Sequence, residues 1–355
     1  MKILFSGGGT LGPVTPLLAL YENLKDQSEH EFLWVGTKNG PEKKLVDHEG
    51  IRFFILPESK LRRYFSLQTF TDIFLFLGAF FQSIVLLKKE KPDVCISAGG
   101  YVSVPIHWAA ILLGIPTWIH QQDVVVGLAN RLMSAGATLI TLALEKTVSK
   151  FPKEKTQLLG NPVRPSIFLG SREEAFRVFS LDPHLPVIFA TGGGTGSEKI
   201  NVLVAQLAFE LSDQVQIIHL TGKERKTLEP TMPLSHYHTY EFLDDTMALA
   251  YAAADIVISR GGFGTLSELS ALSKAAIVIP KTGHQEENIA FCASAGAVIS
   301  CNENTTTVLE LADKVTLLLK DTPLRQSLGQ SLSSVVPIAT SSSMLKALAA
   351  VTKNK

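Results

Sequence analysis

Short apolar runs that end in glycine recur along this chain. Residues 2–6 form the first run, and Gly7-Gly8-Gly9-Thr10-Leu11-Gly12 follows it directly. Leu17, Leu20 and Leu24 then recur at helical spacing, which predicts an amphipathic helix over residues 13–25. A buried strand, a glycine turn and a helix in this order predict the start of a doubly wound α/β domain.

The same pattern restarts in the second half of the chain. The apolar run 187–191 leads into Gly192-Gly193-Gly194-Thr195-Gly196-Ser197, and a helical segment follows through Leu211. This similarity predicts two α/β halves. The proline-punctuated segment 159–165 is typical of an interdomain linker. We expect one domain over 1–160, a second over 161–335, and a C-terminal helix within 336–355 that returns to pack on the first.

Two further strand ends in the first half carry polar or glycine residues. The strand 94–97 precedes Gly99, Gly100 and Tyr101, and a helix is predicted over 106–113. The strand 117–119 ends in the sequence His120-Gln121-Gln122-Asp123. Ligands of open α/β sheets bind outside the carboxyl ends of the strands. We therefore expect both glycine loops of this half and the His120–Asp123 segment to face one crevice.

The segment 259–288 carries the strongest ligand-binding pattern. After the apolar strand 255–258, Arg260-Gly261-Gly262-Phe263-Gly264 is too rich in glycine for a helix or strand, and Thr265 is the predicted helix start. A helix N-terminus favours a phosphate, and Glu268, expected in the first turn, has a carboxylate suited to a ribose diol. His284-Gln285-Glu286-Glu287-Asn288 follows the next strand. Together these features indicate a nucleotide-sugar site, whereas the glycines alone fit a turn that needs them for packing.

An apolar run of nine residues, 73–81, lies between basic clusters. Lys60, Arg62 and Arg63 precede it, and Lys88, Lys89 and Lys91 follow it. It is shorter than the roughly 20 residues that a membrane-spanning helix needs. Two interpretations stay open: a core helix, or a helix that lies on an anionic membrane surface with one face.

Composition excludes several classes of protein. The 355 residues are 46% hydrophobic and 19% charged, with a formal net charge of zero, so no global basic charge indicates nucleic acid binding. Three widely spaced cysteines lack metal or redox spacing, which favours free thiols in a cytoplasmic protein. The N-terminal stretch has too short an apolar run for a signal peptide.

The motifs together resemble a known family. RGGFGTLSEL with HQEEN, GGGT at 7–10, GGYVS at 99–103, GNPVR at 160–164, GGGTGS at 192–197 and FLDD at 242–245 occur in the order found in the MurG family. This is glycosyltransferase family 28, with the two-domain GT-B fold. Its members transfer N-acetylglucosamine from UDP-GlcNAc to lipid I in peptidoglycan synthesis.

The resemblance implies a role for each matched residue. In the C-terminal domain Thr195 would contact the diphosphate and the backbone of Leu243 the uracil. Phosphate and ribose would meet Phe263, Gly264, Thr265, Leu266, Ser267 and Glu268, and the sugar would meet His284, Gln285 and Asn288. Thr10, Leu11, Gly12, Asp123 and Arg164 map to positions that the family uses around the donor or at the interdomain cleft. The N-terminal glycine loops, with Gly99, Gly100 and Tyr101, would receive the lipid-linked diphosphate acceptor.

The implied reaction is a direct displacement at the anomeric carbon by the C4 hydroxyl of lipid-linked N-acetylmuramyl-pentapeptide. Helix dipoles, backbone amides and Arg or Lys would neutralise the leaving diphosphate. No Asp-x-Asp metal motif stands near the glycine loops, so we expect no metal and no cofactor. The resemblance also implies a peripheral protein at the cytoplasmic face of the membrane.

The chain departs from the family pattern at the expected base. Leu11-Gly12-Pro13 stands where the family has Gly-Gly-His, and His120-Gln121-Gln122-Asp123 stands where it often has His-Glu-Gln-Asn. Asp123, oriented by His120, is our candidate for the missing base, and a hydrogen bond from Asp123 to the sugar is the alternative. Two other functions stay open: a UDP-GlcNAc 2-epimerase, and a UDP-sugar-binding relative without activity.

Overall fold

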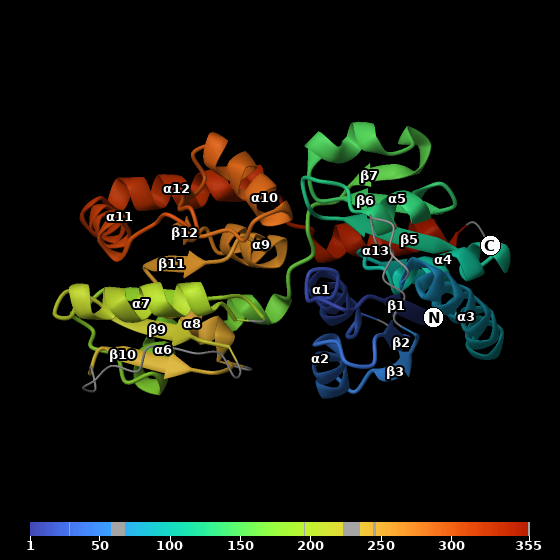
Figure 1. Ribbon diagram of the computed structural model, residues 1–355, viewed down its shortest axis with the longest axis horizontal. Coiled ribbons are helices and arrows are strands. Elements are labelled where there is room, and N and C mark those ends of the chain that lie inside the picture. Colours follow the sequence, from blue (N-terminus) through green and yellow to red (C-terminus); the bar gives the residue numbers. More distant parts are fainter. Residues whose placement is uncertain (28, 58–67, 195, 223–234, 244–245, 354–355) are drawn as a thin grey trace. The chain divides into compact units, whose positions relative to one another are not determined.

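Two parallel β-sheets organise the computed structural model (Figure 1). It describes all of residues 1–355 except 28, 58–67, 195, 223–234, 244–245 and 354–355, and for 68–72 it describes the backbone alone. The chain divides into one unit of Met1–Arg164 with Ile338–Lys355 and another of Pro165–Pro337. Each unit is described by itself.

The first unit holds seven parallel strands in the order β3-β2-β1-β4-β5-β6-β7. Its strands are β1 (Lys2–Ser6), β2 (Glu31–Gly36), β3 (Arg52–Ile55), β4 (Val94–Ser97), β5 (Thr117–Gln121), β6 (Leu139–Leu142) and β7 (Thr156–Leu158). Its helices are α1 (Thr15–Leu24), α2 (Glu42–His48), α3 (Gln68–Glu90), α4 (Ser103–Leu112), α5 (Leu128–Ser134) and α13 (Ser341–Thr352), with short 3₁₀ turns at Glu145–Lys150 and Lys153–Lys155.

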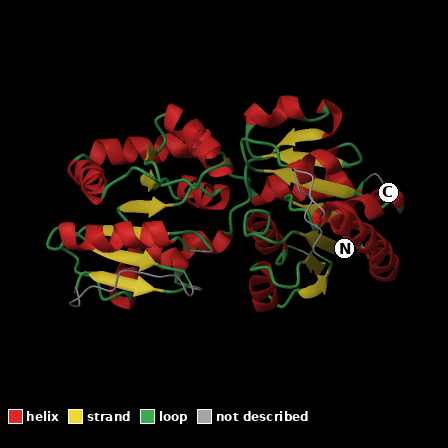
Figure 2. Ribbon diagram, in the orientation of Figure 1, coloured by secondary structure: helices red, strands yellow, loops and turns green. Residues whose placement is uncertain are grey.

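Alternate residues of β1 enter two separate cores of the first unit. Ile3 and Phe5 of β1 pack with α1 and α13, whereas Leu4 packs with α3 and α4. Side chains alternate across a strand, so both faces of this sheet are covered, and Figure 2 shows the helices on either side. This explains why the central strands β1 and β4 are nearly continuous apolar runs.

The second unit repeats the plan with six parallel strands in the order β10-β9-β8-β11-β12-β13. Its strands are β8 (Val187–Thr191), β9 (Gln216–Leu220), β10 (Tyr237–Tyr240), β11 (Ile256–Ser259), β12 (Ala276–Val278) and β13 (Ile299–Ser300). Its helices are α6 (Arg172–Val178), α7 (Glu198–Glu210), α8 (Met247–Ala253), α9 (Phe263–Ala271), α10 (His284–Ser294), α11 (Val308–Lys320) and α12 (Thr322–Val335), after a 3₁₀ turn at Pro165–Leu169.

The boundary between the units differs slightly from the expected one. The GNPVR segment belongs to the first unit, because Asn161 forms a parallel bridge with Ile338 and Asn23 Nδ2 donates to the Val163 carbonyl at 3.0 Å. The C-terminal helix α13 also lies in this unit, where Met344, Ala347 and Leu348 are buried beside β1.

Helix α3 has one face buried in the core of the first unit and another apolar face exposed to solvent. Ala79, Ser83 and Leu87 are buried, and Phe76 stacks edge-on against Trp108 of α4 with ring centroids 5.3 Å apart. Another face exposes Phe74 (73%), Phe81 (62%) and Val85 (68%). Within the residues described, no helix is long and apolar enough to cross a membrane.

Candidate functional site

The central strands of each sheet carry the glycine loops. In the second unit β8 and β11 are neighbours at the point where the strand order reverses, and in the first unit β1 and β4 hold that position. Ligands of open α/β sheets bind at this topological switch point. The loops 192–197 and 260–262 therefore share one such end, and the loops 7–12 and 99–101 share the other.

The glycines after β11 allow α10 to pack on the loop. A Cβ built on Gly261 would lie 2.6 Å from Ile289 Cγ1 and 3.2 Å from the Gln285 carbonyl oxygen. Any larger residue would therefore push α10 away from the N-terminus of α9. Helix α9 begins at Phe263, whose side chain is buried, so the expected start at Thr265 was wrong and Glu268 lies in the second turn.

The core of the second unit fixes the carboxylate of Glu268. The Tyr251 hydroxyl donates to Glu268 Oε2 at 2.9 Å. Tyr251 is buried and contacts Phe189 of β8 edge-on, with ring centroids 5.0 Å apart. Glu268 is thus held at the end of the sheet with a preset orientation, as a hydrogen-bond acceptor for a diol requires.

The HQEEN segment forms the first turns of α10. Gln285 and Asn288 lie one turn apart on the same face of this helix. Asn288 is buried, Gln285 is half-buried, and His284 is exposed. Gln285 Oε1 accepts from the Lys281 amide at 2.9 Å, and its Nε2 lies 4.0 Å from where a Gly262 Cβ would be. Gln285 therefore stands directly beside the glycine loop.

Arg260 also belongs to this site, although we did not expect it from the sequence. Its guanidinium pairs with Glu303 and donates to Ser197 Oγ at 2.6 Å and to the Ile279 carbonyl at 3.2 Å. It thus joins the ends of β8, β11 and β12 beside the N-termini of α7 and α9. A cation beside two helix N-termini suits an anionic ligand such as a diphosphate. The sequence feature that could have identified Arg260 as a site residue is its position directly before Gly261.

The two glycine loops of the first unit lie against each other. Ser103 Oγ donates to the Ser6 and Gly99 carbonyl oxygens, both at 2.8 Å. A Cβ built on Gly9 would lie 2.7 Å from the Tyr101 hydroxyl oxygen. Tyr101 therefore closes over the first loop. The Pro13 ring lies beside the second loop, with Cγ 3.3 Å from where a Gly100 Cβ would be, in the turn that precedes α1.

His120 is buried, and two polar groups occupy its ring nitrogens. Nδ1 contacts Thr141 Oγ1 and Nε2 contacts Asn161 Oδ1, both at 2.9 Å. Burial lowers the pKa of His120 to about 4, although the Asn161 hydrogen bond opposes this shift. The imidazole is therefore neutral at pH 7, and it does not orient Asp123 by a direct hydrogen bond.

Asp123 and Gln122 lie beyond the end of β5. Asp123 is half-exposed. The buried Gln122 donates from Nε2 to the Gly12 carbonyl at 2.7 Å, which ties this segment to the first glycine loop. Asp123 is thus the sequence neighbour of a residue that contacts the first glycine loop. The His120 side chain, in contrast, is buried in the core.

The remaining expected residues are spread over both units. Thr10 and Gly12 are exposed, Leu11 is half-buried, and Arg164 is the last residue of the first unit's main segment. Leu243 is buried in the second unit, and Ser267 Oγ bonds the Phe263 carbonyl within α9. Thr195 lies outside the described residues. Within the described part of the chain no cluster of three or more His, Cys, Asp or Glu side chains is arranged to hold a metal.

Family models match both halves of the chain. Residues 3–141 match the glycosyltransferase family 28 N-terminal domain, and residues 187–335 match the family 28 C-terminal domain. The chain belongs to glycosyltransferase family 28. This confirms the resemblance seen in the motifs, and the protein is a glycosyltransferase.

Relatives with the same domains have a defined activity in their names. The chain is 37% identical over 322 residues to a protein of Clostridium kluyveri, covering 88% of this chain and 90% of that one. That protein is named UDP-N-acetylglucosamine–N-acetylmuramyl-(pentapeptide) pyrophosphoryl-undecaprenol N-acetylglucosamine transferase. A Shouchella clausii protein of the same name is 37% identical over 280 residues, covering 79% of this chain and 78% of its own.

Solved structures confirm the GT-B fold. MurG of Acinetobacter baumannii superposes with a TM-score of 0.72 at 23% identity, covering 99% of both chains. The UDP-GlcNAc 2-epimerase of Neisseria meningitidis reaches 0.66 at 15% identity, covering 98% of this chain and 100% of its own. The fold is therefore common to transferases and epimerases, and the family domains, not the fold, separate them.

Proposed function

We propose that this protein transfers N-acetylglucosamine from UDP-GlcNAc to the C4 hydroxyl of N-acetylmuramyl-pentapeptide carried on pyrophosphoryl-undecaprenol, with inversion at the anomeric carbon. The observation that carries the proposal is 37% identity to a transferase of this name across 88% of the chain. The reaction converts lipid I to lipid II in peptidoglycan synthesis.

The donor binds the second unit in this proposal. The N-terminus of α9 and Arg260 meet the diphosphate together with Thr195, and Glu268, held by Tyr251, accepts from the ribose hydroxyls. His284, Gln285 and Asn288 of α10 meet the sugar, and the backbone of Leu243 meets the uracil. The support is the convergence of a helix N-terminus, a cation and a fixed carboxylate at one switch point.

The acceptor binds the first unit. The loops 7–12 and 99–101 offer backbone N–H groups to its diphosphate. The acceptor hydroxyl attacks the anomeric carbon, the bond from that carbon to the phosphate oxygen breaks, and UDP leaves. The hydroxyl proton passes to a base, for which half-exposed Asp123 is the candidate. Arg260 and the α9 N-terminus stabilise the charge that develops on UDP.

The lipid acceptor places the protein at a membrane surface, peripherally and on the cytoplasmic side. The exposed apolar face of α3 supports this proposal, because Phe74, Phe81 and Val85 are mostly solvent-exposed. Lys88 and Lys89 at the end of α3 are exposed as well, which suits anionic headgroups.

The deciding experiment measures UDP release from UDP-GlcNAc with and without a soluble lipid I analogue. We expect release only with the analogue, together with a disaccharide product detected by mass. Isomerisation of UDP-GlcNAc without acceptor would favour the epimerase, and binding of UDP-GlcNAc without turnover would favour a non-catalytic relative.

A further inference from the structure

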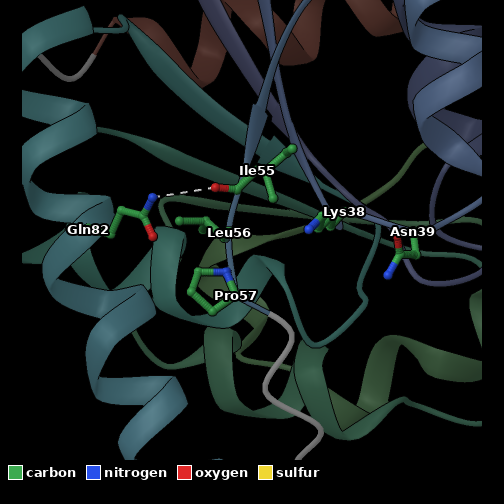
Figure 3. Close-up of a pocket in the computed structure, with 6 residues that line it drawn as sticks. All are labelled: Lys38, Asn39, Ile55, Leu56, Pro57 and Gln82. Atoms are coloured by element: carbon green, nitrogen blue, oxygen red, sulfur yellow. Dashed lines mark hydrogen bonds between the residues drawn. The ribbon is translucent and has the colours of Figure 1, made fainter.

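A surface cavity of about 380 Å³, open to solvent, lies in the first unit beyond the carboxyl end of β3 (Figure 3). This volume falls within the range of ligand pockets, about 300–1,000 Å³. Its lining residues are Lys38, Asn39, Ile55, Leu56, Pro57 and Gln82. None of them belongs to the glycine loops, so the cavity is separate from the site described above.

The lining combines an apolar floor with a cation and two amides. Ile55, Leu56 and Pro57 form the floor, where Leu56 is buried. Gln82 reaches in from α3 on one side, and its Nε2 donates a 3.5 Å hydrogen bond to the Ile55 carbonyl (Figure 3). Lys38 and Asn39 stand on the other side, on the loop after β2. Such a lining suits a ligand with methyl groups, amides and one negative charge.

The loop that carries Lys38 and Asn39 is fixed to the first glycine loop. The buried Glu42 carboxylate accepts from the Thr37 amide at 2.7 Å, and its other oxygen accepts from the Gly9 amide at 3.1 Å. Gly40 closes the turn, since a Cβ there would lie 2.0 Å from Glu42 Oε2. The cavity and the glycine loop therefore hold a constant position relative to each other.

We propose that this cavity receives the carboxylate end of the acceptor's peptide, with Lys38 as the cation that pairs with it. The inference rests on the proposed function, in which the acceptor diphosphate meets the adjoining glycine loop. A peptide end supplies the methyl groups, amides and single carboxylate that the lining matches. A lipid chain would not match it, because Lys38, Asn39 and Gln82 line its sides.

The test compares two soluble lipid I analogues that differ only at the peptide terminus, one with a free carboxylate and one with a carboxamide. The parent should have a KM about two- to fivefold lower for the carboxylate, the range of an exposed ion pair. Lys38→Gln should raise the KM for the carboxylate to that of the carboxamide, with kcat and the KM for UDP-GlcNAc unchanged. Lys44→Gln, which removes an exposed charge on α2 outside the cavity, should behave as the parent.

Each other outcome overturns the inference in a distinguishable way. A Lys38→Gln enzyme that still prefers the carboxylate shows that another group binds the peptide terminus. An equal rise in KM for both analogues assigns Lys38 to a different part of the acceptor, such as its diphosphate. A parent that uses neither analogue contradicts the proposed function itself, and the peptide assignment fails with it.

Discussion

The buried hydroxyl of Tyr251 donates a 2.9 Å hydrogen bond to the carboxylate of Glu268. We expect Tyr251→Phe to raise the KM for UDP-GlcNAc about fivefold with little change in kcat, since one lost hydrogen bond is worth roughly 1 kcal/mol. Glu268→Ala should lower the stabilisation of the fold by bound UDP-GlcNAc by roughly 1–3 kcal/mol, measured from thermal midpoints. Tyr21→Phe, which removes a hydroxyl in the first unit, is the control. An unchanged KM in Tyr251→Phe would assign Tyr251 to core packing alone.

Glu42→Gln should destabilise the first unit. The carboxylate is fully buried and accepts from the Thr37 amide, the Thr37 hydroxyl and the Gly9 amide. An amide nitrogen in place of one oxygen would face a donor, so we expect a loss of about 2–3 kcal/mol of unfolding free energy in urea. The exposed Glu31, which pairs with Lys2 at 3.1 Å, provides the control Glu31→Gln, with a loss under about 1 kcal/mol. Equal losses in the two variants would contradict this role of Glu42.

Asp123→Asn tests the proposed base with almost no change in shape. We expect kcat to fall at least about tenfold while the KM for UDP-GlcNAc stays nearly constant, and the acidic limb of the pH profile to move. Since both ring nitrogens of His120 are bonded to other residues, His120 is a poor substitute as base. Full activity with an unchanged pH profile would show that Asp123 is not the base, and stabilisation of the departing UDP would then be the main contribution to catalysis.

His107 on α4 should make the fold sensitive to acid. Its side chain is fully buried, neither ring nitrogen has a partner among the described residues, and burial lowers its pKa from 6.5 to about 3. The unfolded chain takes up this proton below pH 6.5 and the folded chain does not, so stability falls as the pH drops from 6.5 toward 3. The unfolding free energy of His107→Leu, taken relative to that of the parent, should therefore be about 1.4 kcal/mol higher at pH 5.5 than at pH 7.5. Urea unfolding at both pH values measures this, and parallel pH dependence of the two proteins would refute it.

The exposed face of α3 should bind anionic vesicles in a salt-sensitive way. Phe74→Ser with Phe81→Ser should weaken binding several-fold, because both side chains are more than half exposed and would enter the headgroup region. Phe76, which also belongs to the apolar run 73–81, is a poorer test position, since it packs on Trp108. Lys88→Glu with Lys89→Glu tests the electrostatic part, while Arg62 and Arg63 lie outside the described residues. Wild-type vesicle binding by both double variants would place the membrane surface elsewhere.

Local patterns predicted the strands at the centre of each sheet, the glycine turns and the fold class, because buried parallel strands are short apolar runs and glycine marks the turns at their ends. The strands β3, β6, β7, β10 and β13 were not predicted. The start of α9 was predicted two residues late, since the burial of Phe263 depends on packing and not on helix propensity. His120 was expected to face the crevice. Its side chain is instead buried and bonds Asn161, which comes from a segment that the sequence presents as a linker.

The contacts that hold the site together were not predictable from local sequence. Tyr251 and Glu268 come from different helices, and Arg260 pairs with Glu303 of a distant loop. Glu42 appears in the sequence as an ordinary acidic residue at a helix start. Its role depends on how β1 and β2 bring two loops together, which spacing along the chain does not reveal.

Helix α13 gives the first unit a core made from segments on both sides of the second unit. Ile3 and Phe5 precede the second unit in the chain, and Met344, Ala347 and Leu348, buried with them, follow it. Ala339 donates to the Asn161 carbonyl at 2.9 Å, so the returning segment docks where the chain leaves the unit. The first unit can therefore complete this core only after the whole second unit has been synthesised, whereas the second unit has all of its residues in one continuous segment.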